Sequence, residues 1–398
     1  MDIPVRSTPG PVPASGRTNR VLWAFGFRPF YLLASLFAAL SILLWVAQFS
    51  GLLGSAYLAG PQWHGHEMLF GFAMAVIAGF LLTAVATWTQ QPPLHGTALI
   101  ALALLWLAGR VLVLSPLPLA AALANALFPV ALAAAIAIPL VRTRNHRNLV
   151  FVILLSLMGV LSLTLHLSAQ GLLVLPMQSS LQMGLDLVLL VIVVISGRVV
   201  PMFTNNGVPD AGASRNRALE IAAPAIVVLL LVADLLQWNG MPLAALALLA
   251  AMVHAWRLFL WRPWRTLRTP LLWILHAAYG WIVMHLALRG MASLGWVGPT
   301  LATHALTVGA IGGMTIGMMT RTARGHTGRP LKAGATETAM FVLIQLAALV
   351  RVLGGIVAPA HYLAAVQASG LFWSAAFGLY AFSYWNVLTR PRLDGRPG

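Results

Sequence analysis

The sequence predicts an all-α, polytopic membrane protein with about 12 transmembrane helices and both termini in the cytoplasm. Hydrophobic residues make up 60% of the 398-residue chain and charged residues 8%, whereas roughly a quarter of the residues in soluble domains are charged. Apolar runs of 18 to 25 residues recur along the chain, and each is long enough for a helix to cross a bilayer core of about 30 Å. The alternating pattern of barrel strands is absent, so helices are the expected spanning elements.

The first expected element is a cytoplasmic segment, residues 1–20, which carries Arg6, Arg17 and Arg20. It lacks the apolar region of a cleaved signal peptide. A single transmembrane domain over residues 21–388 and a cytoplasmic tail over 389–398 complete the expected organisation. The expected spans are 30–51, 66–89, 96–115, 117–141, 148–170, 180–200, 218–237, 241–261, 271–290, 299–320, 336–357 and 362–386.

The net charge of +16 is concentrated at the ends and loops that this topology places in the cytoplasm. Of the 24 lysine and arginine residues, all lie there except Arg110, Arg289 and Arg351. This distribution follows the positive-inside rule, which supports both the number of spans and their orientation. We therefore expect lipid headgroups, and not nucleic acid, to be the partners of these charges.

The absence of cysteine excludes disulfides, iron–sulfur clusters, thiolate-bound zinc and covalently attached c-type haem. Any metal would take nitrogen, oxygen or thioether ligands. Histidine is the informative residue type, because eleven histidines stand beside eight carboxylates. Ionisable groups inside a span are costly, and they therefore indicate function by default.

Span two begins with the letters WHGHE, which place His64, His66 and Glu67 at the outer mouth of an apolar run. In a regular helix the two imidazoles would lie about 200° apart, whereas in an extended entry segment both can face one ion. The segment therefore holds a metal, or gives one ligand to each of two sites. Glu67 either balances the positive helix end or handles protons.

Span six contains Asp186 and is followed by the inner loop GRVVPMFTNNGVPD. Asp186 lies in the outer part of the span, where a carboxylate can supply or relay protons. Pro201 is expected to end or kink the helix, and Asn205 suits a turn. Alternatively, arginines near the inner ends of spans six and ten bind the carboxylates of a buried cofactor: Arg198, Arg321 and Arg324.

Span nine, LLWILHAAYGWIVMHLALRG, carries His276 and His285 nine residues apart. At about 100° per residue they lie on opposite faces of the helix, so they cannot serve one site. At about 1.5 Å of rise per residue, His276 and His254 of span eight fall at nearly the same depth near the inner side. Two histidines at equal depth on neighbouring helices can clamp a haem, which makes this pair candidate axial ligands.

Span ten, HALTVGAIGGMTIGMMTRTARGHTGRP, spaces Gly309, Gly313 and Gly317 four residues apart on one face. Close helix packing is the favoured interpretation of this bare face, and clearance for a flat macrocycle is the alternative. His304 projects from a different face, which allows it to point into a pocket. With His166 of span five, it forms a second candidate haem pair nearer the outside. The outer layer of histidines comprises His64, His66, His166, His285 and His304.

Four segments of the chain closely resemble the corresponding segments of the NnrS family: WHGHEMLFGF, GRVVPMFTNNG, LHAAYGWIV and HALTVGAIGGMTIGMMTRTARGHTGRPL. These are bacterial haem- and copper-containing membrane proteins associated with the response to nitric oxide. The resemblance runs in order from about residue 20 to 388. It covers His64, His66, Glu67, Arg198, Asn205, His276, His304, His326 and, less closely, His166 and His254; His285 lies outside it.

The resemblance implies a haem- and copper-binding protein of the bacterial inner (cytoplasmic) membrane that binds or reduces nitric oxide and protects against nitrosative stress. In this hypothesis one or two b-type haems bind the gas, copper near His64 and His66 assists, and Glu67 and Asp186 move protons. The electron donor is a quinol or a redox protein. The histidines available as metal ligands are His64, His66, His166, His254, His276, His285 and His304.

Two other classes of function fit the same pattern. A proton-coupled secondary transporter also has twelve spans in many families, and its histidine layers would act as a relay. A haem or copper assembly factor would hold its metal only in transit. The transporter hypothesis predicts a colourless protein and substrate flux in vesicles. The assembly-factor hypothesis predicts less than one bound metal per protein.

Overall fold

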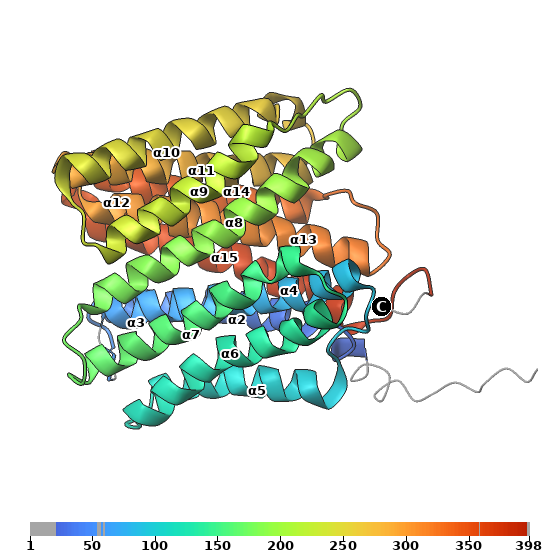
Figure 1. Ribbon diagram of the computed structural model, residues 1–398, viewed down its shortest axis with the longest axis horizontal. Coiled ribbons are helices and arrows are strands. Elements are labelled where there is room, and N and C mark those ends of the chain that lie inside the picture. The colour runs from blue at the N-terminus through green and yellow to red at the C-terminus, as the bar shows by residue number, and fades with distance from the viewer. Residues whose placement is uncertain (1–20, 54–56, 59, 358, 396–398) are drawn as a thin grey trace, which may run out of the picture.

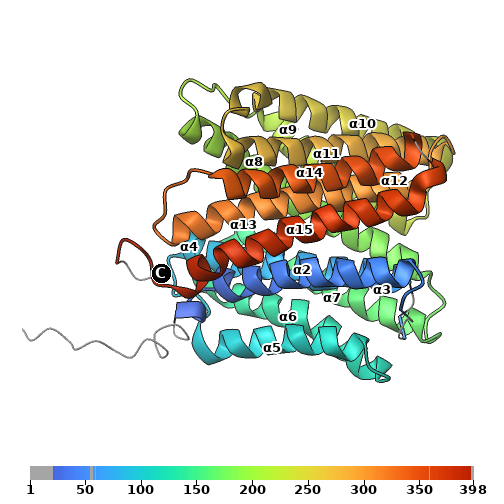
Figure 2. The same ribbon diagram turned by 180° about the vertical axis from the view of Figure 1, so that it is seen from behind.

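The structure is a computed structural model that describes residues 21–53, 57–58, 60–357 and 359–395. Within these residues, 12 helices are long and apolar enough to span a membrane, so the predicted all-helical class and the number of spans are confirmed. The helices run side by side, with α3 and α12 at one end and the C-terminus at the other (Figures 1 and 2). We call the end with α3 and α12 the distal end, and the end with the C-terminus the terminal end. The segment 1–20 and Arg396 lie outside the described residues.

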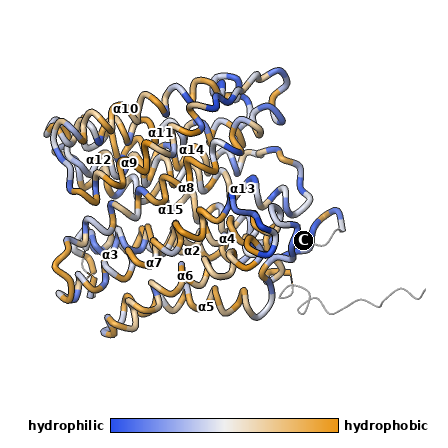
Figure 3. The backbone as a smooth tube through the Cα atoms, viewed as in Figure 1, coloured by the Kyte–Doolittle hydropathy of each residue, from blue (hydrophilic) through white to orange (hydrophobic). Residues whose placement is uncertain are grey.

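The twelve spans form three consecutive groups of four. The first group comprises α2 (Phe27–Phe49), the segment from α3 to α4 (Pro61–Thr89), α5 (Gly96–Val113) and α6 (Pro118–Arg142). The second comprises α7 (Val150–Ala169), α8 (Met177–Gly207), α9 (Arg217–Leu235) and α10 (Gly240–Leu260). The third comprises α11 (Pro270–Ser293), the segment from α12 to α13 (Pro299–His326), α14 (Ala335–Val357) and α15 (Tyr362–Thr389). The tube in Figure 3 is apolar along the helices and hydrophilic mainly near their ends.

The three groups close into a ring. The last helix of each group packs against the first helix of the next, as α6 does on α7, α10 on α11 and α15 on α2. Arg28 of α2 stabilises the contact between α2 and the end of α15, because its Nη1 donates to the carbonyl oxygens of Leu388 (2.8 Å) and Arg390 (3.0 Å). The second span of each group lies inside, where these three spans contact one another.

Two of the inner spans share an unusual local structure. Each begins with a proline and a six-residue α-helix, α3 (Pro61–His66) or α12 (Pro299–His304). A π-helical segment follows, η1 (Glu67–Ala73) or η4 (Ala305–Gly312), and then a regular helix, α4 (Met74–Thr89) or α13 (Gly313–His326). Short π-helical segments are frequent at functional sites. His66 and His304 therefore occupy equivalent positions, immediately before each one.

The glycine face of the tenth span packs on α11. A Cβ atom on Gly313 would lie 2.9 Å from Cβ of Ala278, and one on Gly317 would lie 2.8 Å from Leu275. A Cβ atom on Gly309 would collide with the Trp281 side chain. Close helix packing is thus confirmed for this face, and α11 fills the space that a macrocycle would need.

The sixth span is longer than the sequence predicted. The helix α8 continues through Pro201 to Gly207, whereas the proline was expected to end or kink it near residue 200. Proline is tolerated in spanning helices because neighbouring groups satisfy the freed backbone atoms. The expected turn follows later, where the Asn205 side chain accepts from the backbone N–H of Ala213 and donates to its carbonyl oxygen, each at 2.9 Å.

Candidate functional site

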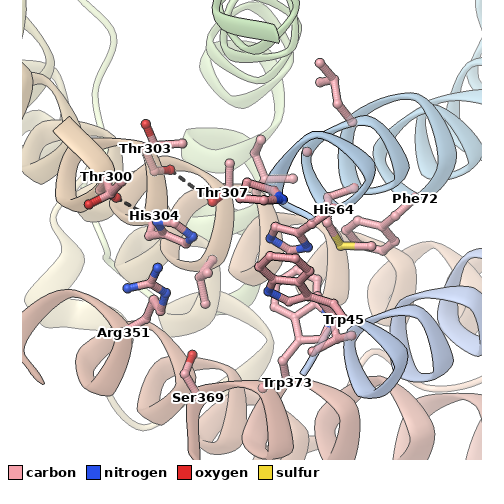
Figure 4. A pocket seen from close by; sticks show the side chains of 18 of the residues that line it. Trp45, His64, Phe72, Thr300, Thr303, His304, Thr307, Arg351, Ser369 and Trp373 are labelled. Atoms are coloured by element: carbon pink, nitrogen blue, oxygen red, sulfur yellow. Dashed lines mark hydrogen bonds between the residues drawn. The ribbon is translucent and has the colours of Figure 1, made fainter. Parts of the chain in front are cut away.

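A cavity of about 260 Å³ lies in the distal half of the molecule, between α2, α3, α8, α12, α14 and α15 (Figure 4). This volume is close to the lower bound of roughly 300 Å³ for ligand pockets. Most of the wall is apolar. The polar side chains in it are few and come from five of these spans: His64, Gln178, Thr300, Thr303, His304, Thr307, Arg351 and Ser369.

His304 is held in a fixed orientation at the end of α12. Its Nδ1–H donates to the carbonyl oxygen of Thr300 at 2.6 Å, a contact within one helical turn. Because Nδ1 carries the proton, Nε2 keeps its lone pair. Figure 4 shows the ring pointing into the cavity, so this lone pair is available to a ligand.

His64 faces His304 from the opposite side of the cavity (Figure 4). Its ring stacks on Trp45 of α2, with centroids 4.8 Å apart and an angle of 12° between the planes. Its Nδ1 is buried and has no hydrogen-bond partner among the described residues. A buried polar atom without a protein partner is uncommon and indicates a ligand, ion or water as its partner.

Arg351 of α14 places a positive charge in the cavity wall beside His304 (Figure 4). It is 9% exposed, and its Nη2 donates to the Tyr362 hydroxyl at 2.9 Å. No carboxylate pairs with it in the part of the chain that the structure describes. Sequence reasoning missed this residue by treating it as a charge near a helix end. The available signal was its position outside the loops that the sequence was expected to place in the cytoplasm.

A second polar cluster lies on the other side of α3. His66 Nδ1 donates to Oε1 of Glu67 at 2.7 Å, and Arg110 of α5 donates to the same oxygen at 2.9 Å. Arg110 also donates to the Asn125 side chain of α6. All four residues are buried, so the single carboxylate and the single guanidinium balance each other.

His166 of α7 completes this second cluster. Its ring lies 4.7 Å from that of His66, centroid to centroid and nearly perpendicular, and its Nδ1 shares a 2.6 Å hydrogen bond with the Tyr57 hydroxyl. Burial raises the pKa of Tyr57, so the phenol stays neutral. The Nε2 atoms of His66 and His166 are both buried without partners among the described residues. A histidine whose other nitrogen is held by a carboxylate or similar group is the usual arrangement of a metal ligand.

The helical conformation of α3 explains why His64 and His66 serve different clusters. Pro61–His66 is a regular α-helix, in which side chains two positions apart diverge by about 200°. His64 lines the cavity and His66 contacts His166. Of the two arrangements that the sequence left open, the structure has the one in which each histidine faces its own site.

Asp186 and His285 belong to a third cluster in the distal half. Arg289 of α11 donates to Asp186 of α8 at 3.0 Å and also to Asp234 of α9. His285 Nδ1 donates to the carbonyl oxygen of Ala302 at 2.8 Å, and its Nε2 has no partner among the described residues. These residues do not line the cavity.

His254 and His276 differ in the partners of their ring nitrogens, since Nε2 of His254 is buried without a partner among the described residues. His276 contacts the carbonyl oxygens of Leu272 (3.0 Å) and Trp261 (3.3 Å), so both ring nitrogens have protein partners. His254 Nδ1 bonds the Tyr279 hydroxyl at 2.7 Å. Neither histidine lines the cavity.

The three arginines considered for cofactor carboxylates also lie away from the cavity. Arg198 donates to Asn148 at 2.7 Å, and Arg324 donates to Glu337 at 2.8 Å. The Arg321 guanidinium lies 3.8 Å from the centroid of the Phe203 ring.

Comparison with known proteins identifies one family. The family model described as NnrS protein matches residues 21–392, which is nearly the whole chain. No curated protein matches the sequence.

Proposed function

The chain belongs to the NnrS family, and from that premise we propose that it binds haem and copper in the bacterial inner membrane and binds or reduces nitric oxide, which protects against nitrosative stress. The observation that carries this proposal is the pair of histidines, His64 and His304, on opposite sides of a largely apolar cavity. A quinol or a redox protein would supply the electrons.

The residues of the cavity fit a b-type haem. Neutral imidazole is a ligand of haem iron, and His304 offers Nε2 while His64 has no competing bond at Nδ1. Haem carboxylates need a positive partner at membrane depth, and Arg351 lies in the wall without a carboxylate of its own. The remaining wall is apolar enough to exclude water from the site.

The residues of the second cluster fit copper. His66 and His166 present two buried imidazole nitrogens without partners among the described residues. The described residues contain no group of three or more histidine, cysteine, aspartate or glutamate side chains suited to a metal. Two imidazoles and no carboxylate ligand suit a soft, low-coordinate ion, and among common metals copper prefers such nitrogen donors.

Each cluster has a distinct role in this proposal. Bound haem and copper would supply the nitric oxide binding site and the one-electron chemistry. Glu67 orients His66 through the 2.7 Å hydrogen bond and is itself held by Arg110. Glu67 and Asp186 are buried carboxylates in the distal half of the molecule, and we assign them proton transfer.

The first experiment is an absorption spectrum and elemental analysis of the full-length protein purified in detergent. We expect a haem Soret band, bound copper, and a spectral change on addition of nitric oxide. The variant His304→Ala should lose most of the haem. The matched control His276→Gln alters a buried histidine whose nitrogens already have protein partners, and it should keep the haem.

A colourless wild-type protein without copper would overturn the proposal. Substrate flux in vesicles would then support the proton-coupled transporter. Substoichiometric metal, with nitric oxide consumption unchanged in His304→Ala, would support the assembly factor.

A further inference from the structure

The third distal cluster brings two carboxylates to one guanidinium. Arg289 of α11 donates from Nη1 to Oδ1 of Asp186 at 3.0 Å and from Nη2 to Oδ1 of Asp234. The Asp186 side chain is fully buried, the Arg289 side chain is 9% exposed and the Asp234 side chain is 13% exposed. The cluster joins three helices, α8, α9 and α11.

The second oxygen of each carboxylate has no hydrogen-bond donor. Oδ2 of Asp186 and Oδ2 of Asp234 are buried and have no partner among the described residues. Both carboxylates bind the same guanidinium through their Oδ1 atoms, which holds the two carboxyl groups beside each other. The other neighbours do not supply this donor: Gln182 donates to Oδ1 of Asp186 at 3.3 Å, and His285 gives its Nδ1–H to Ala302.

Charge balance distinguishes this pair from the other carboxylates that form ion pairs inside the bundle. Glu67 has Arg110, Glu220 has Arg257, and Glu337 has Arg324, so each carboxylate has at least one arginine of its own. Asp186 and Asp234 share Arg289. If both were ionised, the cluster would carry a net negative charge at a depth where uncompensated charge is strongly disfavoured.

We propose that Asp186 and Asp234 hold one proton in common, between their Oδ2 atoms, and that together with Arg289 they form a neutral proton-binding site. One carboxyl group then donates O–H···O⁻ to the other, which satisfies both buried oxygens. The pair binds and releases a single proton without any redox step. The Asp234 side chain is more exposed than that of Asp186, so the proton exchanges with the surroundings through Asp234. The site needs neither haem nor copper, so its test is separate from that of the proposed function.

The test is infrared spectroscopy of the full-length protein in lipid vesicles near neutral pH. We expect a carbonyl band from one protonated carboxyl group, which shifts when the vesicles are transferred to D₂O. Asp186→Asn and Asp234→Asn should each abolish the band, since the remaining carboxylate then pairs alone with Arg289. The matched control is Glu337→Gln, which removes a carboxylate already balanced by Arg324 and should leave the band unchanged.

A second measurement requires no variant. Wild-type protein grown with carboxyl-¹³C aspartate should show the band at lower frequency, whereas ¹³C glutamate should leave it in place. The proposal is overturned if the wild-type protein shows no protonated carboxyl band, if labelled glutamate shifts it, or if it persists in both folded aspartate variants.

Discussion

His64 and His66 stand two positions apart in one helical turn, yet they face separate clusters. Under the proposed function, His64→Ala should reduce haem content and leave copper in place, whereas His66→Ala should do the reverse. Haem is measured by absorbance and copper by elemental analysis of the same preparations. His95→Ala, in an exposed loop, is the control that should change neither. Loss of the same metal from both variants would show that the two histidines act at one site.

Arg110 and Glu67 form a buried ion pair whose members depend on each other. Removing one partner of such a pair typically costs about 3–5 kcal/mol, because the other charge stays buried without compensation. Arg110→Met should therefore lower the thermal stability of the detergent-solubilised protein strongly. The double variant Glu67→Met, Arg110→Met should recover much of the loss, as followed by thermal unfolding. A double variant that is less stable than Arg110→Met would contradict this account.

Substitutions on the glycine face of α13 can test its close packing against α11. Gly313→Ala would place a Cβ atom 2.9 Å from that of Ala278 on α11, and overpacking of this kind typically costs about 1–3 kcal/mol. Gly280→Ala is the matched control on α11, where the nearest atom in the way is a Leu258 methyl 3.8 Å from the new Cβ atom. Replacing glycine by alanine inside a helix otherwise gains roughly 0.5–1 kcal/mol. We expect the first variant to melt earlier than wild type and the second to melt at the same temperature or later. Equal stability of the two variants would refute close packing as the role of Gly313.

The spanning elements could be predicted from the sequence because hydropathy depends on local composition. The run expected at 96–115 is α5, Gly96–Val113, and the glycines of the tenth span lie against α11 as expected. The direction in which a side chain points across the bundle could not be predicted. The sequence left open whether His64 and His66 face one site, and it is the helical conformation of α3 that separates them.

The site residues that sequence reasoning missed share one property. Arg351 was expected near an outer helix end and Arg289 in an outer loop, and Asp234 was not considered. Each acts through partners on other spans, as in the bond from Arg289 to Asp186, residues 103 positions apart. Such contacts depend on which helices are neighbours, and the packing of the whole bundle determines this.

For the whole molecule, the ring of three groups places each distal cluster at a junction. His66 and Arg110 of the first group meet His166 of the second. Asp186 and Asp234 of the second group meet Arg289 of the third. In the cavity, His304 and Arg351 of the third group meet Trp45 of the first. Each cluster therefore depends on correct packing between groups, and the cavity in particular depends on the contact of α15 with α2.

The contact of α15 with α2 means that the order of the groups along the polypeptide is not essential to the architecture. Arg28 already contacts the backbone of Leu388 and Arg390, so a glycine–serine linker can join residue 395 to residue 21, the outermost residues that the structure describes. New ends can be opened after Arg142, in the loop between α6 and α7. We expect this circular permutant to purify as a monodisperse species with the cofactor content of the wild-type protein. A permutant opened inside α8, which breaks an inner span, should instead aggregate.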